Sequence, residues 1–266
     1  MVDNILEVRD LKVWFPVKKG VFGRTTGYVK AVDGVSFVMR RGETLGVVGE
    51  SGSGKTTVAR VIAGLQRPTD GSFEVSGRVA MVFQDPLGSL NPRMTVRATL
   101  EEAIDCAKPS RGSSLASHAS TASHASSASP ARTASGLLAL VGLDDSALDK
   151  YPHEFSGGQR QRICIARAIA TDPELLICDE AVSALDLSIR AQVLELLTGL
   201  KEKLGLSLLF ITHDLGVVQH VADRILVMNR GKIMEEGPCG RVLKAPREEY
   251  TRLLMSSVPK IGKPLT

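Results

Sequence analysis

The sequence predicts an α/β protein whose core is a largely parallel β-sheet. Short apolar runs that are typical of buried strands alternate with segments of helical periodicity along most of the chain. A glycine-rich stretch, residues 49–56, stands between one such run and one such helix. The 266 residues are 43% hydrophobic and 23% charged, an ordinary globular composition that allows a sizeable core.

The first part of the chain is predicted to form strands and then a helix. Residues 5–17 and 31–49 mix β-branched residues with turn signals, which favours strands, and the basic, glycine-rich residues 18–28 predict a loop between them. Residues 56–65 have helical spacing, and the turn-forming residues 68–72 end that helix.

The rest of the chain continues the alternation. Strands are predicted over residues 78–84, 174–180 and 207–214, and a hairpin over residues 224–237 with its turn at Asn229–Gly231. Helices are predicted over residues 95–107 and 190–206, and a third from an N-cap at Ser156 to a stop at Thr171–Pro173.

Composition excludes several classes of protein. The net charge of +4 argues against nucleic-acid binding by bulk electrostatics. No apolar run approaches the roughly 18–20 residues that span a bilayer, and the first residues do not resemble a signal peptide, so we expect a cytosolic chain that reaches a membrane only through a partner. The four cysteines are far apart and form no CxxC pair, which favours free thiols.

The glycine-rich stretch predicts a phosphate-binding loop of the pattern GxxxxGK[ST]. Glycines let successive backbone N–H groups curl round phosphate oxygens at the start of a helix. Lys55 is placed to reach the β- and γ-phosphates, and Thr56 offers a hydroxyl to Mg²⁺. The alternative is a chance Gly/Ser turn before a helix. The predicted nucleotide-binding residues are Gly49, Glu50, Ser51, Gly52, Ser53, Gly54, Lys55, Thr56 and Thr57.

Two acids follow the apolar run at residues 174–178. Ligands of open α/β sheets bind at the carboxyl ends of strands, so Asp179 is placed to hold Mg²⁺ and Glu180 to polarise an attacking water as a general base. The alternative is a solvated acid pair that leads into a turn.

A second anion-binding helix start lies at Ser156–Gln159, where Gly157 and Gly158 bare the backbone. One chain therefore carries two phosphate-binding loops and one acid pair. We expect two such domains to pair head to tail, with the phosphate loop of one facing Ser156 of the other and ATP between them.

In these motifs and their order the sequence resembles the ATP-binding-cassette (ABC) ATPases. The Walker A loop is residues 49–56, the Walker B segment is residues 175–179 with Glu180 after it, and the signature is FSGGQ at residues 155–159. Gln84 matches the Q-loop glutamine, residues 183–186 the D-loop, and His213 the switch histidine. Phe15 stands where the family places an aromatic ring that stacks on adenine, although the adjacent Trp14 competes for that role.

The resemblance implies a fold and a domain layout. The fold would be an ABC nucleotide-binding domain with a RecA-like mixed or parallel sheet core, an N-terminal antiparallel β subdomain and an inserted α-helical subdomain. The whole chain, residues 1–266, would be one ABC ATPase domain. Its core would span about residues 1–85 and 161–235, its helical subdomain about residues 86–160, and its C-terminal extension about residues 236–266.

Several stretches resemble the importer branch for oligopeptides, dipeptides or nickel, in particular its second ATPase subunit. They are residues 16–37, 83–96, 151–163 and 245–259. The last resembles an extension usually built round His-Pro-Tyr-Thr, of which Tyr250 and Thr251 remain while Glu248 and Glu249 replace His-Pro. Ala181 stands where a proline usually follows the catalytic glutamate.

The resemblance also implies a function. ATP hydrolysis would energise import, with Glu180 activating water, His213 supporting the γ-phosphate and Gln84 sensing Mg²⁺ and the water. Partners would be a second cassette, which we expect to differ from this one, two permease subunits and, indirectly, an extracytoplasmic solute-binding protein. No nucleic acid is involved, and the chain would lie peripherally on the cytoplasmic face of the membrane.

Other functions stay open. One is a soluble ABC ATPase of translation or DNA maintenance, and another is the ATPase of an importer for nickel or another solute. An ABC exporter ATPase is favoured less, because no membrane span is fused and the tail is importer-like.

The Ser/Ala-rich tract at residues 113–135 lies between Gln84 and Ser156, inside the expected helical subdomain. It has almost no large apolar side chains, so we expect a mobile loop or a poorly packed alanine-rich helix. His118 and His124 within it are expected to be solvated.

Overall fold

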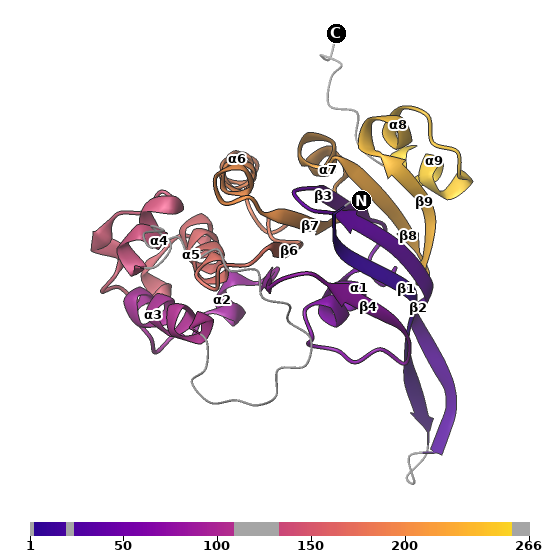
Figure 1. Cartoon of the computed structure of the whole chain (residues 1–266), viewed down its shortest axis with the longest axis horizontal. Coiled ribbons are helices and arrows are strands. Elements are labelled where there is room, and N and C mark those ends of the chain that lie inside the picture. Colours follow the sequence, from indigo (N-terminus) through magenta and orange to yellow (C-terminus); the bar gives the residue numbers. More distant parts are fainter. Residues whose placement is uncertain (1–2, 20–23, 109–132, 257–266) are drawn as a thin grey trace. The chain divides into compact units, whose positions relative to one another are not determined.

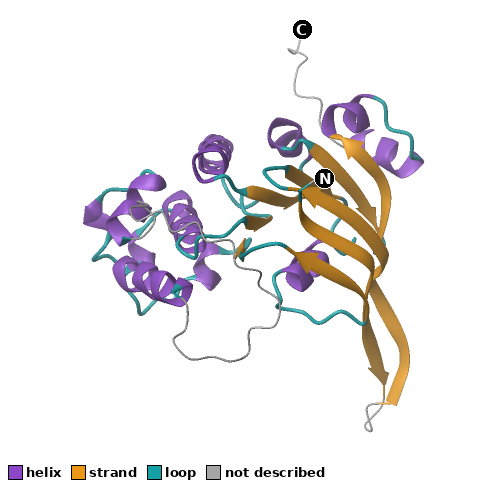
Figure 2. Ribbon diagram, viewed as in Figure 1, coloured by secondary structure: helices purple, strands orange, loops and turns teal. Residues whose placement is uncertain are grey.

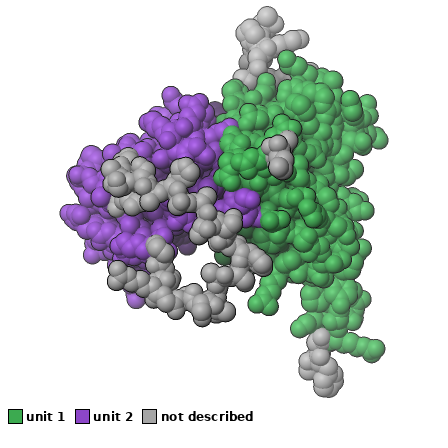
Figure 3. Space-filling model, in the orientation of Figure 1, with its two compact units in different colours: residues 1–74, 209–266 green, residues 75–208 purple. Residues whose placement is uncertain are grey.

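A computed structural model of the chain describes residues 3–19, 24–108 and 133–256. The chain forms two compact units, residues 1–74 with 209–266 and residues 75–208 (Figure 3). Most of the Ser/Ala-rich tract, with His118 and His124, lies outside the described residues. Its end at Ala134 and Ser135 begins a helix. The predicted boundaries of core, helical subdomain and C-terminal extension stay a prediction.

The first unit contains a three-stranded sheet of order β2-β1-β4. β1 (Asn4–Lys19) and β2 (Arg24–Arg40) are long antiparallel strands, and β4 (Asp70–Val75) flanks β1 (Figures 1 and 2). The predicted loop over residues 18–28 was wrong for most of its length, since Lys18 pairs with Thr25 and Lys19 with Arg24. Cross-strand pairing satisfies the backbone there, so the strands continue although the side chains are exposed.

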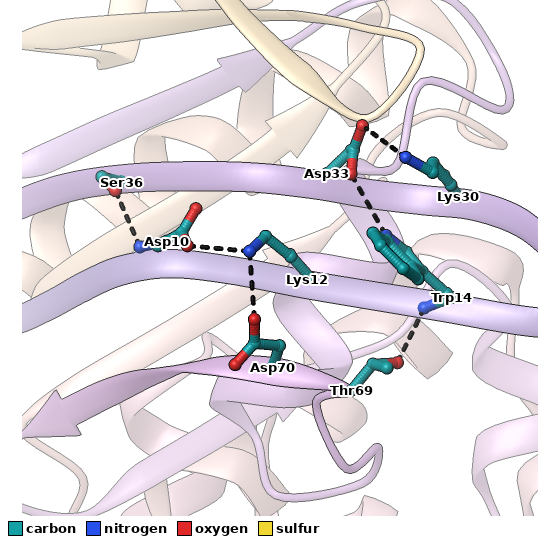
Figure 4. A network of polar contacts seen from close by, with 8 residues as sticks. All are labelled: Asp10, Lys12, Trp14, Lys30, Asp33, Ser36, Thr69 and Asp70. Carbon is teal, nitrogen blue, oxygen red and sulfur yellow. Dashed lines mark hydrogen bonds and ion pairs between the residues drawn. The ribbon is translucent and has the colours of Figure 1, made fainter.

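Polar contacts join the three strands of this sheet (Figure 4). Lys12 Nζ on β1 lies 2.9 Å from a carboxylate oxygen of Asp10 and 3.0 Å from one of Asp70 on β4. The backbone N–H of Asp10 donates to Ser36 Oγ on β2 at 2.8 Å. These contacts are exposed to solvent, so they fix register more than they add stability.

The same unit holds strands that run in parallel, as predicted. β3 (Thr44–Val48) is parallel to β8 (Arg224–Asn229), and β9 (Lys232–Pro238) returns antiparallel to β8. β7 (Ser207–Thr212) lies mostly in this unit. The hairpin turn is confirmed, because Arg230 (φ 47°) and Gly231 (φ 79°) both have the positive φ that a type I′ turn requires.

Among its described residues the helices are α1 (Lys55–Ile62), α7 (Leu215–Val221), α8 (Cys239–Lys244) and α9 (Glu249–Ser256). Of these, α1 was predicted. α7 and α8 are shorter than α1, and α9, which is as long as α1, was missed. The last three surround an apolar cluster of the unit. Its buried members are Val48, Leu215, Val218, Ile225, Val227, Cys239 and Val242.

In its described residues, the second unit combines the parallel strands β5 (Val79–Val82) and β6 (Leu175–Asp179) with five α-helices. These are α2 (Pro86–Ser89), α3 (Val96–Ala107), α4 (Ala134–Leu140), α5 (Gly157–Ile169) and α6 (Leu187–Leu204). Short 3₁₀ turns occupy Asp145–Ala147 and Pro152–Glu154. Leu100 of α3, Leu137 and Leu138 of α4, and Ile163 and Ile165 of α5 are fully buried.

The predicted helices of this unit are confirmed, with small shifts at their ends. Thr95 caps α3 by accepting a hydrogen bond from the Ala98 N–H. α6 begins three residues earlier than predicted, after the extended backbone of Asp186, and ends at Gly205 in the left-handed conformation. Among the helices of the described residues, none has both the length and the apolar character needed to cross a bilayer.

Leu45 tests the packing of β3, which leads into the phosphate loop. Leu45 is fully buried and Leu65 is 60% exposed. We expect Leu45→Ala to lower the free energy of unfolding by about 2–5 kcal/mol, because it leaves a cavity, and Leu65→Ala to change it by less than about 0.5 kcal/mol. Urea unfolding measures both, and equal effects would contradict this packing.

Candidate nucleotide site

The predicted phosphate loop follows β3 and leads into α1 in the first unit. Gly49 has φ 152° and Gly54 has φ 103°, which are conformations for glycine. A Cβ at Gly49 would lie 2.1 Å from the Met228 carbonyl oxygen, and one at Gly54 would lie 2.2 Å from that of Ala31. The loop therefore runs against the backbones of β8 and β2, and neither glycine can carry a side chain.

Lys55 is only 4% exposed, and the loop curls around its ammonium group. Nζ donates to the carbonyl oxygens of Gly49 and Glu50 at 2.8 Å each and to Ser53 Oγ at 3.3 Å. The first turn of α1 carries no acidic residue. A polyphosphate fits this loop, because the loop offers a buried cation at the start of a helix and a backbone that carries no side chains at Gly49 and Gly54.

Thr56 and Thr57 follow Lys55 in the first turn of α1, and both are half-buried. Ser51 and Gly52 are exposed at the tip of the loop, and Gly52 has open space around it. The predicted loop residues therefore form one continuous turn between β3 and α1.

The two aromatic candidates on β1 differ in their surroundings. Trp14 Nε1 donates to Asp33 Oδ1 at 3.2 Å, and Lys30 Nζ lies 4.4 Å from its ring centroid (Figure 4). Phe15 is 41% exposed. Since Trp14 is engaged within the sheet, Phe15 is the ring more open to a ligand.

His213 follows β7 in the first unit and is exposed. The next residue, Asp214, caps α7 through hydrogen bonds from the N–H groups of Gly216 (2.9 Å) and Val217 (3.3 Å). The cap fixes the backbone that carries His213.

In the second unit the acid pair stands at the end of β6. Asp179 is the last residue of the strand and is 6% exposed. Glu180 has φ 50°, a conformation that costs a residue with a side chain about 1–3 kcal/mol. Hydrogen bonds from the N–H and Oγ of Ser183 to the Glu180 carbonyl, at 3.1 and 2.9 Å, help to hold it there.

The parallel pairing of β5 and β6 brings Gln84 to Glu180. Val82 is in register with Cys178, so the residues that follow each strand lie side by side. Gln84 Nε2 donates to Glu180 Oε2 at 3.1 Å. Two residues that lie 96 positions apart in the chain are thereby in direct contact.

The predicted helix start at Ser156 is confirmed as the N-cap of α5. Ser156 Oγ accepts from the Gln159 N–H at 3.3 Å, and Gln159 Oε1 accepts from the Ser156 N–H at 3.0 Å, a capping box. A Cβ at Gly158 would lie 2.5 Å from Ile189 Cγ2 on α6, whereas Gly157 has open space. Gly158 is therefore required for packing, and Gly157 leaves the backbone accessible.

The donor types of Thr56, Gln84 and Asp179 suit Mg²⁺, which prefers oxygen ligands. In the part of the chain that the structure describes, no three His, Cys, Asp or Glu side chains form a possible metal site. A Mg²⁺ ion that arrives with substrate phosphates needs only one or two protein carboxylates, so the donors present fit.

Sequence reasoning assigned no role to Tyr250, yet its hydroxyl lies 3.4 Å from the Glu50 N–H in the phosphate loop. The only signal was its place in the C-terminal Tyr-Thr pair.

Comparison with known proteins gives a consistent result. A family profile described as ABC transporter matches residues 32–183. The oligopeptide transport ATP-binding protein AppF of Bacillus subtilis is 45% identical over 278 residues, with 98% of this chain and 80% of AppF covered. The dipeptide transport ATP-binding protein DppF of Escherichia coli is 42% identical, with 97% and 77% covered.

Solved structures support the fold. One is a post-hydrolysis dimer of an ATP-binding cassette bound to ADP and phosphate, with a TM-score of 0.68 and 24% identity, covering 88% of this chain and 98% of that one. Another is a cassette of an ABC transporter complex from Clostridium perfringens, with a TM-score of 0.67 and 22% identity, covering 97% of each chain. At this identity the likeness concerns the fold alone.

The two signature glycines should respond differently to the same substitution. Gly158→Ala forces Cβ against Ile189, so we expect a loss of about 1–3 kcal/mol in the free energy of unfolding, and Gly157→Ala should be neutral or slightly stabilising. The double variant Gly158→Ala with Ile189→Ala should destabilise by less than the sum of the two single effects. Denaturant unfolding measures all four proteins, and strict additivity would contradict the contact.

Proposed function

This chain belongs to the ABC transporter family, and we propose that it is the ATP-hydrolysing subunit of an importer for oligopeptides or dipeptides. ATPase activity is a property of the family. The peptide substrate is supported by relatives at 42–45% identity over almost the whole chain whose names state oligopeptide or dipeptide transport. The observation that carries hydrolysis is the direct contact between Gln84 and Glu180 at the end of β6.

In the proposed reaction, the first unit supplies the groups that bind the nucleotide. Backbone N–H groups of the loop, other than that of Glu50, which donates to Tyr250, bind the β- and γ-phosphates together with the ammonium of Lys55. Lys55 exchanges its present carbonyl partners for phosphate oxygens of greater negative charge. Phe15, exposed on β1, stacks on the adenine ring.

The second unit supplies the groups that activate water. Glu180 accepts a proton from the attacking water. The water oxygen bonds to the γ-phosphorus, and the bond between that phosphorus and the β-phosphate oxygen breaks. Gln84 Nε2 holds the Glu180 carboxylate by donating a hydrogen bond to Glu180 Oε2. His213 of the first unit donates a hydrogen bond to the γ-phosphate. Thr56, Gln84 and Asp179 would hold Mg²⁺, which when bound would neutralise negative charge on the phosphates.

A second cassette completes the site in this proposal. Ser156, Gly157, Gly158 and Gln159 form a helix start whose exposed backbone at Gly157 fits an anion supplied by the partner. We expect the partner to be a different cassette. Two permease subunits place the pair peripherally on the cytoplasmic face of the membrane, with a solute-binding protein on the other side.

A cavity of about 450 Å³ in the second unit is a candidate permease contact. Its lining comes from β5, the end of α3 and the end of α5, and includes Cys106 and Ala107. The strand that leads to Gln84 therefore forms one wall, so a segment docked here would touch the element that positions Glu180.

Two alternative functions differ from this proposal in their partners or in their substrate. A soluble ABC ATPase of translation or DNA maintenance would not copurify with integral membrane proteins, and an importer for nickel or another solute would copurify with them but not take up peptides. Affinity purification of the chain from its own cell, followed by uptake assays with labelled di- and oligopeptides, separates the three functions.

Glu180→Gln should preserve ATP binding and lower the turnover number by at least about 100-fold, because the amide cannot accept the proton from water. Glu195→Gln, the same change on the exposed face of α6, is the control and should leave turnover unchanged. A phosphate-release assay and a nucleotide-binding titration measure the two quantities. Unchanged turnover in Glu180→Gln would exclude this residue as the base.

Thiol labelling tests the permease contact. Cys106 is exposed, whereas Cys164, Cys178 and Cys239 are buried, and burial raises the pKa of Cys164 to about 11 and of Cys178 to about 12. A maleimide at pH 7 should therefore label Cys106 at least about 10-fold faster than the others, since the thiolate is the reactive form. Assembly with the permeases should protect Cys106, as measured by mass spectrometry. Labelling at the same rate in the assembled transporter would place the permeases elsewhere.

A further inference from the structure

The C-terminal helix α9 contacts the phosphate loop through Tyr250. The Tyr250 hydroxyl accepts a hydrogen bond from the Glu50 N–H at 3.4 Å, although the two residues are 200 positions apart. Glu50 is the second residue of the loop, directly after Gly49. A residue of the C-terminal Tyr-Thr pair, to which the resemblance assigned no role, therefore reaches the backbone that binds phosphate.

The peptide group between Gly49 and Glu50 is held at both ends. Its carbonyl oxygen accepts from Lys55 Nζ at 2.8 Å, and its N–H donates to Tyr250. Gly49 has φ 152° and lies too close to the Met228 carbonyl for any side chain. The orientation of this peptide is thus set by one contact from inside the loop and one from outside.

Under the proposed function, the hydrogen bond from Lys55 Nζ to the Gly49 carbonyl is temporary. When Lys55 turns to a phosphate, its bonds to the carbonyls of Gly49 and Glu50 are lost. The bond to Tyr250 does not involve Lys55, so it persists in both states. It then becomes the contact that keeps the peptide in place while nucleotide is bound.

The Tyr250 ring is well supported. Tyr250, Leu254 and Met255 of α9 pack against the apolar cluster that includes Val48, the residue just before Gly49. Burial of the ring raises the pKa of the Tyr250 hydroxyl, the Glu50 N–H acts in the opposite direction, and the hydroxyl stays protonated at neutral pH.

The start of α9 is fixed by a buried carboxylate, Glu235 on β9, which is 6% exposed. Its oxygens accept hydrogen bonds from the backbone N–H groups of Arg247 (3.1 Å) and Glu248 (3.2 Å) and from Arg241 Nη1 (3.1 Å). Burial alone would raise the pKa of Glu235, but these donors bring it below its usual value. The carboxylate is therefore charged at neutral pH and anchors the helix that carries Tyr250.

We propose that Tyr250 is a positioning residue for the phosphate loop and that α9, anchored by Glu235, belongs to the nucleotide site. The proposal rests on the proposed function only in that the loop binds ATP. It concerns ATP affinity and leaves the water-activating groups at β6 untouched.

Tyr250→Phe keeps the ring and removes the hydroxyl. We expect the Kd and the KM for Mg·ATP to rise by about 2- to 10-fold, the value of one neutral hydrogen bond, while kcat and Tm stay unchanged. Ser256→Ala is the matched control, because it removes a hydroxyl from the same helix whose partner, the Leu253 carbonyl, lies within α9. Titration of the full chain with a fluorescent ATP analogue measures Kd, and steady-state ATPase assays of the chain paired with its partner cassette measure KM and kcat.

Wild-type affinity in Tyr250→Phe, or a lowered kcat with unchanged Kd, would overturn the proposal. Hydrogen exchange on the wild-type chain provides a test that needs no variant. By thermodynamic reciprocity, ATP should slow amide exchange in residues 249–256. Exchange there that ATP does not change, while it slows exchange in the loop, would also overturn it. Because nucleotide binding and hydrogen exchange are measured on the isolated chain, a failed import role would leave these two results unaffected.

Discussion

The ammonium group of Lys55 is almost completely buried, and a buried cation is tolerated only when hydrogen-bond acceptors surround it. The loop meets this requirement by turning the carbonyl groups of Gly49 and Glu50 inward, and the turn is possible only because positions 49 and 54 are glycines pressed against β8 and β2. The loop is therefore curled by its contacts within the fold, and this preorganisation lowers the ordering cost of binding a phosphate. The strands β8 and β2, which pack against Gly49 and Gly54, hold the loop in this conformation.

The two units contribute different chemistry. The first offers positive charge and open backbone, and the second offers the acid pair Asp179 and Glu180, of which Glu180 has the unusual φ of 50°. Strain at a functional residue persists when the surroundings determine it, and here Ser183 and Gln84 do so from opposite ends of the residue. An ATPase requires both a loop that binds phosphate and a carboxylate that activates water, and the family profile that matches this chain is described as ABC transporter.

Much of the fold and of the site follows from local pattern. The parallel strands, the N-cap at Ser156 and the type I′ turn at Arg230–Gly231 each depend on residues close in sequence. Contacts between residues that are distant in the sequence were not predictable in this way. The sequence around Gly158 does not indicate its contact with Ile189, and the sequence around Gly49 does not indicate its contact with Met228. The helices α7 and α8, of seven and six residues, are too short to show a helical period, and the strand pairing at Lys18 and Lys19 overrode a loop-like composition.

The outer half of β2 has a consequence for solubility. In the three-stranded sheet of the first unit β2 is one of the two edge strands, and its residues Tyr28 and Val29 are 60% and 57% exposed. An exposed, apolar strand edge invites pairing with another chain and, from there, fibril growth. Arg24 and Lys30 flank this stretch and place like charges on any two copies that approach edge to edge. The positive charges of Arg24 and Lys30 thus oppose edge-to-edge aggregation. Salt screens these charges and would weaken their repulsion.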